Sequence, residues 1–128
     1  MTPEEIKAGN ILIQEFMGWK LESTPSELCG TIYQFTRYDN GEVIDEHWGG
    51  DSWSWKENDT MHYDSNFNLL IGVVEKIEKD NYGFKMCRKV VEVYFDDTKE
   101  VILKTKEDCR LNSLYKAVIE FIKWKNKK

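Results

Sequence analysis

Residues 47–64 concentrate the side chains of this chain that could do chemistry. Their sequence, HWGGDSWSWKENDTMHYD, contains both histidines of the protein, three tryptophans, one tyrosine and four acidic residues. Histidine can serve as a base near neutral pH, and His47 and His62 each have a carboxylate close by in sequence that could orient the imidazole. No nucleophile motif, HExxH motif or glycine-rich phosphate loop accompanies them. We therefore expect no catalytic residues. The two histidines are expected to be exposed to solvent or to cap helices.

A metal site in this segment would need two sequence-distant pairs to meet, Asp45 with His47 and His62 with Asp64. The cysteines give no alternative, because they are odd in number, widely spaced and without a CxxC pair: Cys29, Cys87 and Cys109. The sequence therefore predicts no metal, no other cofactor and no disulfide framework.

The tryptophans of the segment have two interpretations. Trp53 and Trp55 alternate with serines, so they could form the inward face of an edge strand. That is the more frequent role of such a pattern, but they could instead be aromatic anchors on an irregular surface, where binding residues concentrate. We call residues 48–63 the acidic arch and expect it to bind a partner through six residues of this region: Trp48, Trp53, Trp55, His47, His62 and Tyr63.

The negative charge of the protein is gathered in the same region. Residues 39–64 hold eight acidic residues and one lysine, a local net charge of −7, whereas the whole protein has a net charge of −5. A protein that binds the phosphate backbone of nucleic acid needs the opposite sign. The basic cluster at the carboxyl end, KWKNKK, is typical of cations placed at the end of a helix. We therefore expect a partner protein with a basic surface, or a homodimer, and no nucleic acid.

The length and composition fit one compact domain over residues 1–128, with 41% hydrophobic and 13% aromatic residues. The amino-terminal sequence MTPEEIKAGN is acidic, unlike a signal peptide, and no apolar run approaches the ~18 residues of a membrane span. We therefore expect an intracellular, cytoplasmic protein without membrane contact.

Three segments have helical periodicity. The first begins with Thr2 as N-cap, Pro3 and Glu5, and ends at Gly18. The second opens at Asp64 or Ser65 and is apolar over more than half its circumference, so we expect it to be the most buried helix, with Gly72 allowing a close contact. The third begins near Asn112 or Ser113, and its inward residues are predicted to be Leu114, Ala117, Val118, Phe121 and Ile122.

Two regions are typical of β-hairpins. Asn40-Gly41 separates two β-rich runs, which predicts a tight turn, whereas the stretch around Pro25 before them is predicted to be a loop. DSWSWK, residues 51–56, could add a third strand. The second hairpin is predicted to have strands over residues 84–95 and 100–105. The order α-ββ(β)-α-ββ-α predicts an α+β sandwich in which an antiparallel sheet, built from two hairpins, is layered with three helices.

Three blocks of the sequence also resemble a known group of proteins. They are EFMGWK at 15–20, YDSNFNLLIGVVEKIE at 63–78 and AVIEFIKWKN at 117–126, about a quarter of the chain. These blocks resemble small hypothetical proteins of phages and prophages, including those of gut Bacteroidetes, and suggest a phage α-β-α sandwich domain. The chain departs from that pattern at Phe67 and Leu69, where tryptophans are usual, and at Gly72, where proline is usual. The resemblance implies a phage setting, hence the cytoplasm of a host cell, and no catalytic residue.

Two classes of function follow from these observations. The first is a non-catalytic interaction module, a phage accessory protein that docks a partner through the acidic arch. The second is a protein that binds or sequesters a small ligand such as a nucleotide, or a cryptic enzyme, with a pocket between the arch and the second helix. A phosphate ligand would need basic residues near the arch to offset its acids.

Overall fold

The computed structural model of the chain describes residues 2–26, 30–39, 42–47 and 61–127. Within these residues the order is α1 (Pro3–Phe16), β1 (Trp19–Ser26), β2 (Gly30–Asp39), β3 (Glu42–His47), α2 (Phe67–Glu78), β4 (Tyr82–Cys87), β5 (Val90–Phe95), β6 (Val101–Lys106) and α3 (Arg110–Asn126). All strand pairs are antiparallel, in two three-stranded sheets ordered β1-β2-β3 and β4-β5-β6. The α+β class and the order of helices and hairpins are confirmed.

The chain divides into two compact units. The first contains Met1–Ile13 and His62–Lys128, and the second contains Gln14–Met61. We describe each by itself, and the single domain over residues 1–128 stays a prediction.

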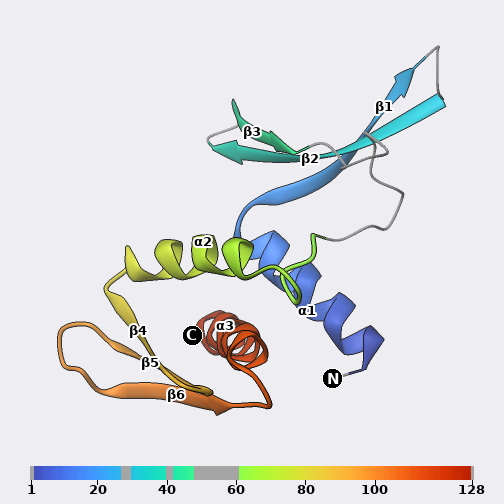
Figure 1. Cartoon of the computed structure of the whole chain (residues 1–128). Helices are drawn as coiled ribbons and strands as arrows, with labels where there is room; N and C mark the ends of the chain where they lie inside the picture. The colour runs from blue at the N-terminus through green and yellow to red at the C-terminus, as the bar shows by residue number, and fades with distance from the viewer. Residues whose placement is uncertain (1, 27–29, 40–41, 48–60, 128) are drawn as a thin grey trace. The chain divides into compact units, whose positions relative to one another are not determined.

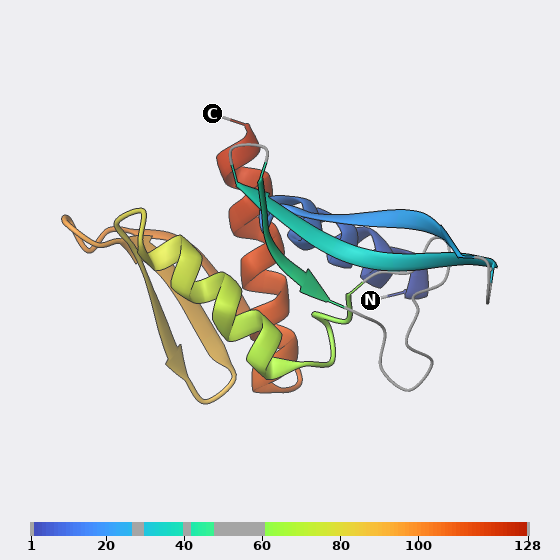
Figure 2. The ribbon, with the colours of Figure 1, turned by 90° about the horizontal axis from the view of Figure 1, so that it is seen from above.

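In the first unit, α3 is the central element. The sheet β4-β5-β6 covers one side of α3, and α2 and the amino-terminal part of α1 lie on the other side (Figures 1 and 2). A helix covered on several sides must be apolar around much of its circumference. The predicted inward residues are all buried, together with three more: Leu114, Ala117, Val118, Phe121, Ile122, Ser113, Tyr115 and Ile119. The most buried helix is therefore α3, not α2 as predicted from the sequence.

The start of α1 has the predicted capping residues. The Glu5 amide donates to the Thr2 hydroxyl oxygen at 3.2 Å, and that hydroxyl donates to the Glu5 carboxylate, also at 3.2 Å. Gly9 lies where α1 approaches α3, and a Cβ there would be 2.5 Å from Tyr115 Oη and 2.6 Å from Ile119 Cδ1. Only glycine allows this approach without displacing a side chain. Gly18, which follows α1, has a φ of 84° as expected for a left-handed helix stop.

Two further predictions for α2 are wrong. Its N-cap is Asn66, whose side chain accepts from the Leu69 amide at 3.2 Å, so the helix begins later than the predicted cap at Asp64 or Ser65. A Cβ on Gly72 would meet no heavy atom of the described residues within 4 Å, so Gly72 does not serve a close contact there. The inner face of α2 is formed by Leu70, Val73, Val74 and Ile77.

The second predicted hairpin is a three-stranded meander. The run over residues 84–95 is not one strand, because it turns at Arg88 and Lys89 between β4 and β5. Arg88 has a φ of 56°, a conformation that sequence arguments assign to glycine or asparagine, so the turn carries no ordinary sequence signal. The predicted connection at residues 96–99 does separate β5 from β6.

In the second unit, β2 and β3 lie on either side of the predicted Asn40-Gly41 position. The loop predicted around Pro25 is wrong, because residues 19–26 form β1 and Pro25 pairs in register with Thr31. An edge strand tolerates proline, since its missing N–H can face away from the neighbouring strand. The segment DSWSWK, predicted as a third strand, lies outside the described residues.

Candidate functional site

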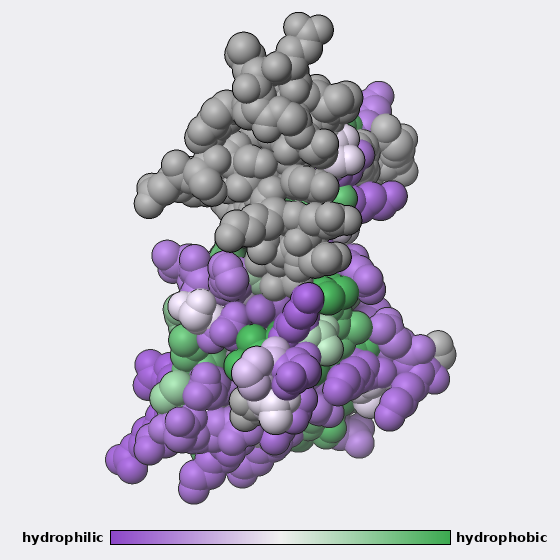
Figure 3. Space-filling view, turned by 90° about the vertical axis from the view of Figure 1, so that its right-hand side faces the viewer, coloured by the Kyte–Doolittle hydropathy of each residue, from purple (hydrophilic) through white to green (hydrophobic). Residues whose placement is uncertain are grey.

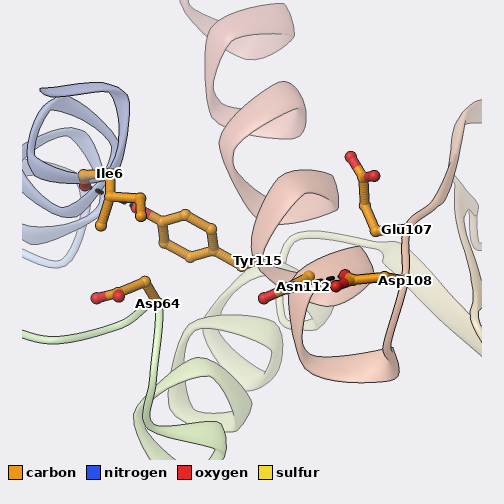
Figure 4. Close-up of a pocket in the computed structure, with 6 residues that line it drawn as sticks. All are labelled: Ile6, Asp64, Glu107, Asp108, Asn112 and Tyr115. Atoms are coloured by element: carbon orange, nitrogen blue, oxygen red, sulfur yellow. Dashed lines mark hydrogen bonds between the residues drawn. The ribbon is translucent and has the colours of Figure 1, made fainter. Parts of the chain in front are cut away.

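A pocket of about 350 Å³ opens in the first unit. Its walls come from α1, from the segment before α2, from the connection between β6 and α3, and from the first turns of α3: Ile6, Asp64, Glu107, Asp108, Asn112 and Tyr115. In Figure 4, Asp64 lies on the side of α1, Glu107 and Asp108 lie on the opposite side, and the Tyr115 ring stands between them. We call it the acidic pocket because three of its six lining residues carry carboxylates.

One wall of the acidic pocket is held by a chain of hydrogen bonds. The Tyr115 hydroxyl lies 2.8 Å from the Ile6 carbonyl oxygen and 3.0 Å from Asn10 Oδ1, so these two acceptors share its proton. The Asn10 amide nitrogen donates to Asp64 Oδ1 at 3.0 Å. Asn10 and Tyr115 are both buried, and burial, together with the negative charge of Asp64, raises the pKa of the Tyr115 phenol. Tyr115 therefore remains a neutral donor at physiological pH.

The opposite wall is held by the start of α3. Asn112 Nδ2 donates to Asp108 Oδ1 at 2.7 Å, and this bond lowers the pKa of Asp108 below its usual value. Asp108 is exposed and therefore stays ionised near neutral pH. Glu107, by contrast, forms a 3.0 Å salt bridge with Lys116, which raises the pKa of that lysine.

Ser113 fixes the position of these acids. Its hydroxyl oxygen accepts from the Glu107 amide at 2.8 Å and donates toward the Lys89 carbonyl oxygen at 2.5 Å. Ser113 itself is fully buried, and its hydrogen bonds tie the segment that carries Glu107 and Asp108 to the β4–β5 turn.

The chemistry of the acidic pocket is that of a cation acceptor. The side chains of Asp64 and Asp108 are carboxylic acids, and neither forms a salt bridge within the described residues. Carboxylates that accept charge-assisted hydrogen bonds are suited to a guanidinium or an ammonium group. A phosphate group, by contrast, would be repelled. Figure 3 shows a face of the first unit on which hydrophilic side chains surround smaller apolar areas.

The sequence-predicted site residues lie only partly within the described structure. Trp48, Trp53 and Trp55 are outside it, and of His47 only the backbone, at the end of β3, is described. His62 is exposed, whereas Tyr63 is buried with 2% of its surface exposed. The ring of Tyr63 therefore does not lie at a surface as predicted. Asp64, considered from the sequence as a carboxylate that could orient His62, accepts a hydrogen bond from Asn10.

Four residues of the acidic pocket were missed by the sequence interpretation: Glu107, Asp108, Asn112 and Tyr115. Their sequence, EDCRLNSLY, starts a helix and has no motif beyond acids ahead of an amphipathic run. The signal that could have singled out these acids is their position at the helix amino terminus, where negative charge is favourable for purely structural reasons. Their proximity to Asp64 comes from tertiary packing alone.

Among the described residues, no group of three or more histidine, cysteine or acidic side chains is arranged to hold a metal ion. No helix within this part of the chain is long and apolar enough to cross a membrane. Comparison with protein families, with curated proteins and with solved structures finds no match to this chain. The resemblance to phage proteins therefore stays a prediction.

Proposed function

We propose that this protein is a non-catalytic interaction module that docks a partner with a basic surface. The observation that carries the proposal is the pair Asp64 and Asp108, two carboxylates without a salt bridge within the described residues, on opposite walls of the acidic pocket. Both are held in place by asparagine side chains, at 3.0 and 2.7 Å respectively. An arginine or lysine of the partner enters between them and completes the charge balance of the site.

The acidic arch is the second contact area in this proposal. Its tryptophans supply apolar anchor surface, and the net charge of −7 over residues 39–64 supplies long-range attraction for a basic partner. The setting we propose is that of a phage-borne accessory protein in the cytoplasm of its host, where the partner is a host or phage protein.

A model ligand tests the acidic pocket directly. We would titrate the ¹⁵N-labelled protein with the blocked peptide Gly-Arg-Gly-Arg-Gly and follow the backbone amides by NMR. Asp64→Asn and Asp108→Asn keep the oxygen that accepts from the neighbouring asparagine but remove the charge. Each is expected to weaken binding about tenfold, equivalent to ~1.4 kcal/mol. Glu100→Gln, an exposed acid in the β5–β6 turn, is the matched control and should leave binding unchanged.

The location of the chemical-shift changes decides the outcome. Changes centred on Asp108, Asn112 and Tyr115, lost in both asparagine variants, support the proposal. Equal binding by the wild type and both variants, or changes that avoid these residues, would contradict it.

A second candidate function rests on the size of the acidic pocket. A volume of about 350 Å³ lies within the ~300–1,000 Å³ typical of small-ligand sites. The three lining carboxylates favour a small amine, such as a polyamine, over the nucleotide considered from the sequence. A thermal-shift screen separates the two candidates, because a ligand at 100 times its Kd adds about 2.7 kcal/mol of stability. A docking module should show no comparable shift with spermidine or other free amines.

A further inference from the structure

A second groove runs between β6 and α3 in the first unit. Its volume is about 380 Å³, and its charged lining consists of four lysines and one glutamate: Lys104, Lys116, Lys123, Lys127 and Glu120. Trp124 forms part of the wall, and its ring packs edge to face against Tyr82 and Phe95. The groove is therefore electropositive, the opposite of the acidic pocket.

The four lysines of the groove differ in their ion pairing within the described residues. Lys116 pairs with Glu107 at 3.0 Å and Lys104 pairs with Glu92 at 3.8 Å. Lys123 and Lys127 form no salt bridge within the described residues, and their spacing of four positions places them on the same face of the α3 carboxyl end. This end of the groove offers a ligand two ammonium groups that form no salt bridge in the described part of the chain.

The groove also follows a free strand edge. In the described sheet β6 pairs only with β5, so its other edge is unpaired. Four consecutive residues, 102–105, line the groove. The register against β5 shifts between Val93 and Tyr94 and leaves Ile102 without a register partner, so the regular alternation of side chains is interrupted here. Lining by consecutive residues agrees with a groove that runs along the edge of the strand. The outer edge of β6 carries the backbone donors and acceptors that pairing with β5 leaves unused within the described sheet.

We propose that an extended acidic segment of a partner protein binds in this groove by strand addition to β6. Its backbone pairs with the outer edge of β6, and its carboxylates bind Lys123 and Lys127. The repeat of donors and acceptors along β6 matches a peptide backbone and not a row of phosphates, and Glu120 repels a uniform polyanion. The lysines also oppose pairing with another lysine-bearing edge, including β6 of a second copy, so the edge selects acidic strands.

A synthetic peptide tests this proposal. The probe is a blocked heptapeptide with the sequence Glu-Val-Glu-Val-Glu-Val-Glu, titrated into the full-length protein and followed by NMR. We expect saturable binding with shifts at residues 101–106 and at the carboxyl half of α3. The double substitution Lys123→Glu and Lys127→Glu should weaken binding at least tenfold. Lys85→Glu, on the exposed edge strand β4, is the matched control and should leave binding unchanged.

Two further probes distinguish strand addition from simple charge attraction. The same heptapeptide with alternate backbone amides methylated keeps every carboxylate but cannot pair with β6, so it should lose binding. An eight-residue oligothymidylate should bind more weakly than the peptide. Equal binding by the methylated peptide, tighter binding by the oligonucleotide, or full binding by the double variant would each overturn the proposal. If circular dichroism shows that the double variant is unfolded, Lys123→Gln and the methylated peptide decide the question.

Discussion

The Tyr115 hydroxyl lies 2.8 Å from the carbonyl oxygen of Ile6, an atom 109 positions earlier in the chain. This contact joins the central helix α3 to α1, and through Asn10 it continues to Asp64, next to α2. Three segments that are distant in sequence thus meet at one buried phenol with 2% of its surface exposed. The acidic pocket exists because these segments are held together here.

Tyr115→Phe tests how much this junction contributes to stability. The substitution keeps the ring but leaves Asn10 Oδ1 and the Ile6 carbonyl oxygen without the phenolic proton. A buried polar group that loses its partner destabilises the protein by about 1–3 kcal/mol, so we expect a decrease of that size in the free energy of unfolding. Urea denaturation measures it. As a control, Tyr94→Phe, whose hydroxyl forms no hydrogen bond within the described residues, should change stability by less than about 0.5 kcal/mol.

The raised pKa of Tyr115 predicts a loss of stability in alkali. The folded state holds the phenolic proton more tightly than the unfolded chain, in which the pKa is near 10.0. This contribution is fully present below pH 10 and decreases as the pH rises above that value, because only the unfolded state then gains from ionisation. The free energy of unfolding should therefore fall more steeply above pH 10 in the wild type than in Tyr115→Phe. Parallel curves for the two proteins would contradict this prediction.

Substitution by alanine should have opposite effects on stability at Gly9 and at Gly72. Gly9→Ala places a methyl group against Tyr115 and Ile119 and should destabilise the protein, because overpacking costs about 1–3 kcal/mol. Gly72→Ala meets no described atom within 4 Å and replaces glycine inside α2, so it should stabilise the protein by up to about 1 kcal/mol. Thermal denaturation of both variants provides the measurement. A stabilising Gly9→Ala would mean that α1 and α3 are less closely packed than the structure has them.

The helices and one hairpin could be predicted because their signals are local. Thr2, Glu5 and Gly18 mark the ends of α1 through hydrogen bonds and a φ angle set within a few residues. Asn40-Gly41 likewise marks the β2–β3 hairpin by turn chemistry alone. Capping and turn residues of this kind can be recognised in the sequence without knowledge of the fold.

The additional strands could not be predicted because tertiary pairing overrides their local preferences. WKLESTPS has the polar and proline content of a loop, yet it pairs along its whole length with β2. Arg88 takes a left-handed conformation that its side chain does not favour, because β4 and β5 pair on either side of it. In both segments, strand pairing within the sheet determines the backbone conformation.

The candidate site, too, could be predicted from the sequence only in part. The sequence interpretation found an acidic, aromatic segment because its composition is unusual, but Tyr63 in that segment belongs to the interior. The acidic pocket combines Asp64 with acids more than forty positions away and with the buried Tyr115. Only the packing of α1 on α3 reveals that combination. Its residues look, one by one, like ordinary helix-capping and core positions.

The hydrogen bond between Asn112 and Asp108 influences the pH below which Asp108, in the acidic pocket, becomes protonated. Asn112→Ala removes the donor that is the largest cause of the lowered pKa of Asp108, so that pKa should rise toward its usual value of 3.8. NMR titration of the Asp108 carboxyl carbon measures the change. Asn68→Ala, at an exposed asparagine on α2, is the control and should leave the pKa unaltered.

The lowered pKa of Asp108 also affects the stability of the protein and its binding to the arginine peptide. Because the pKa of Asp108 is lower in the folded state, this contribution is present above about pH 4 and is lost as the pH falls through the folded pKa. In Asn112→Ala the folded pKa approaches the unfolded one, so this pH-dependent contribution to stability should largely disappear. Asp108 then takes up its proton at a higher pH in the folded protein, and the arginine peptide should dissociate from the pocket at a correspondingly higher pH. Peptide release at the same pH in both proteins would show that Asp108 does not contact the cation, and would leave Asp64 as its acceptor.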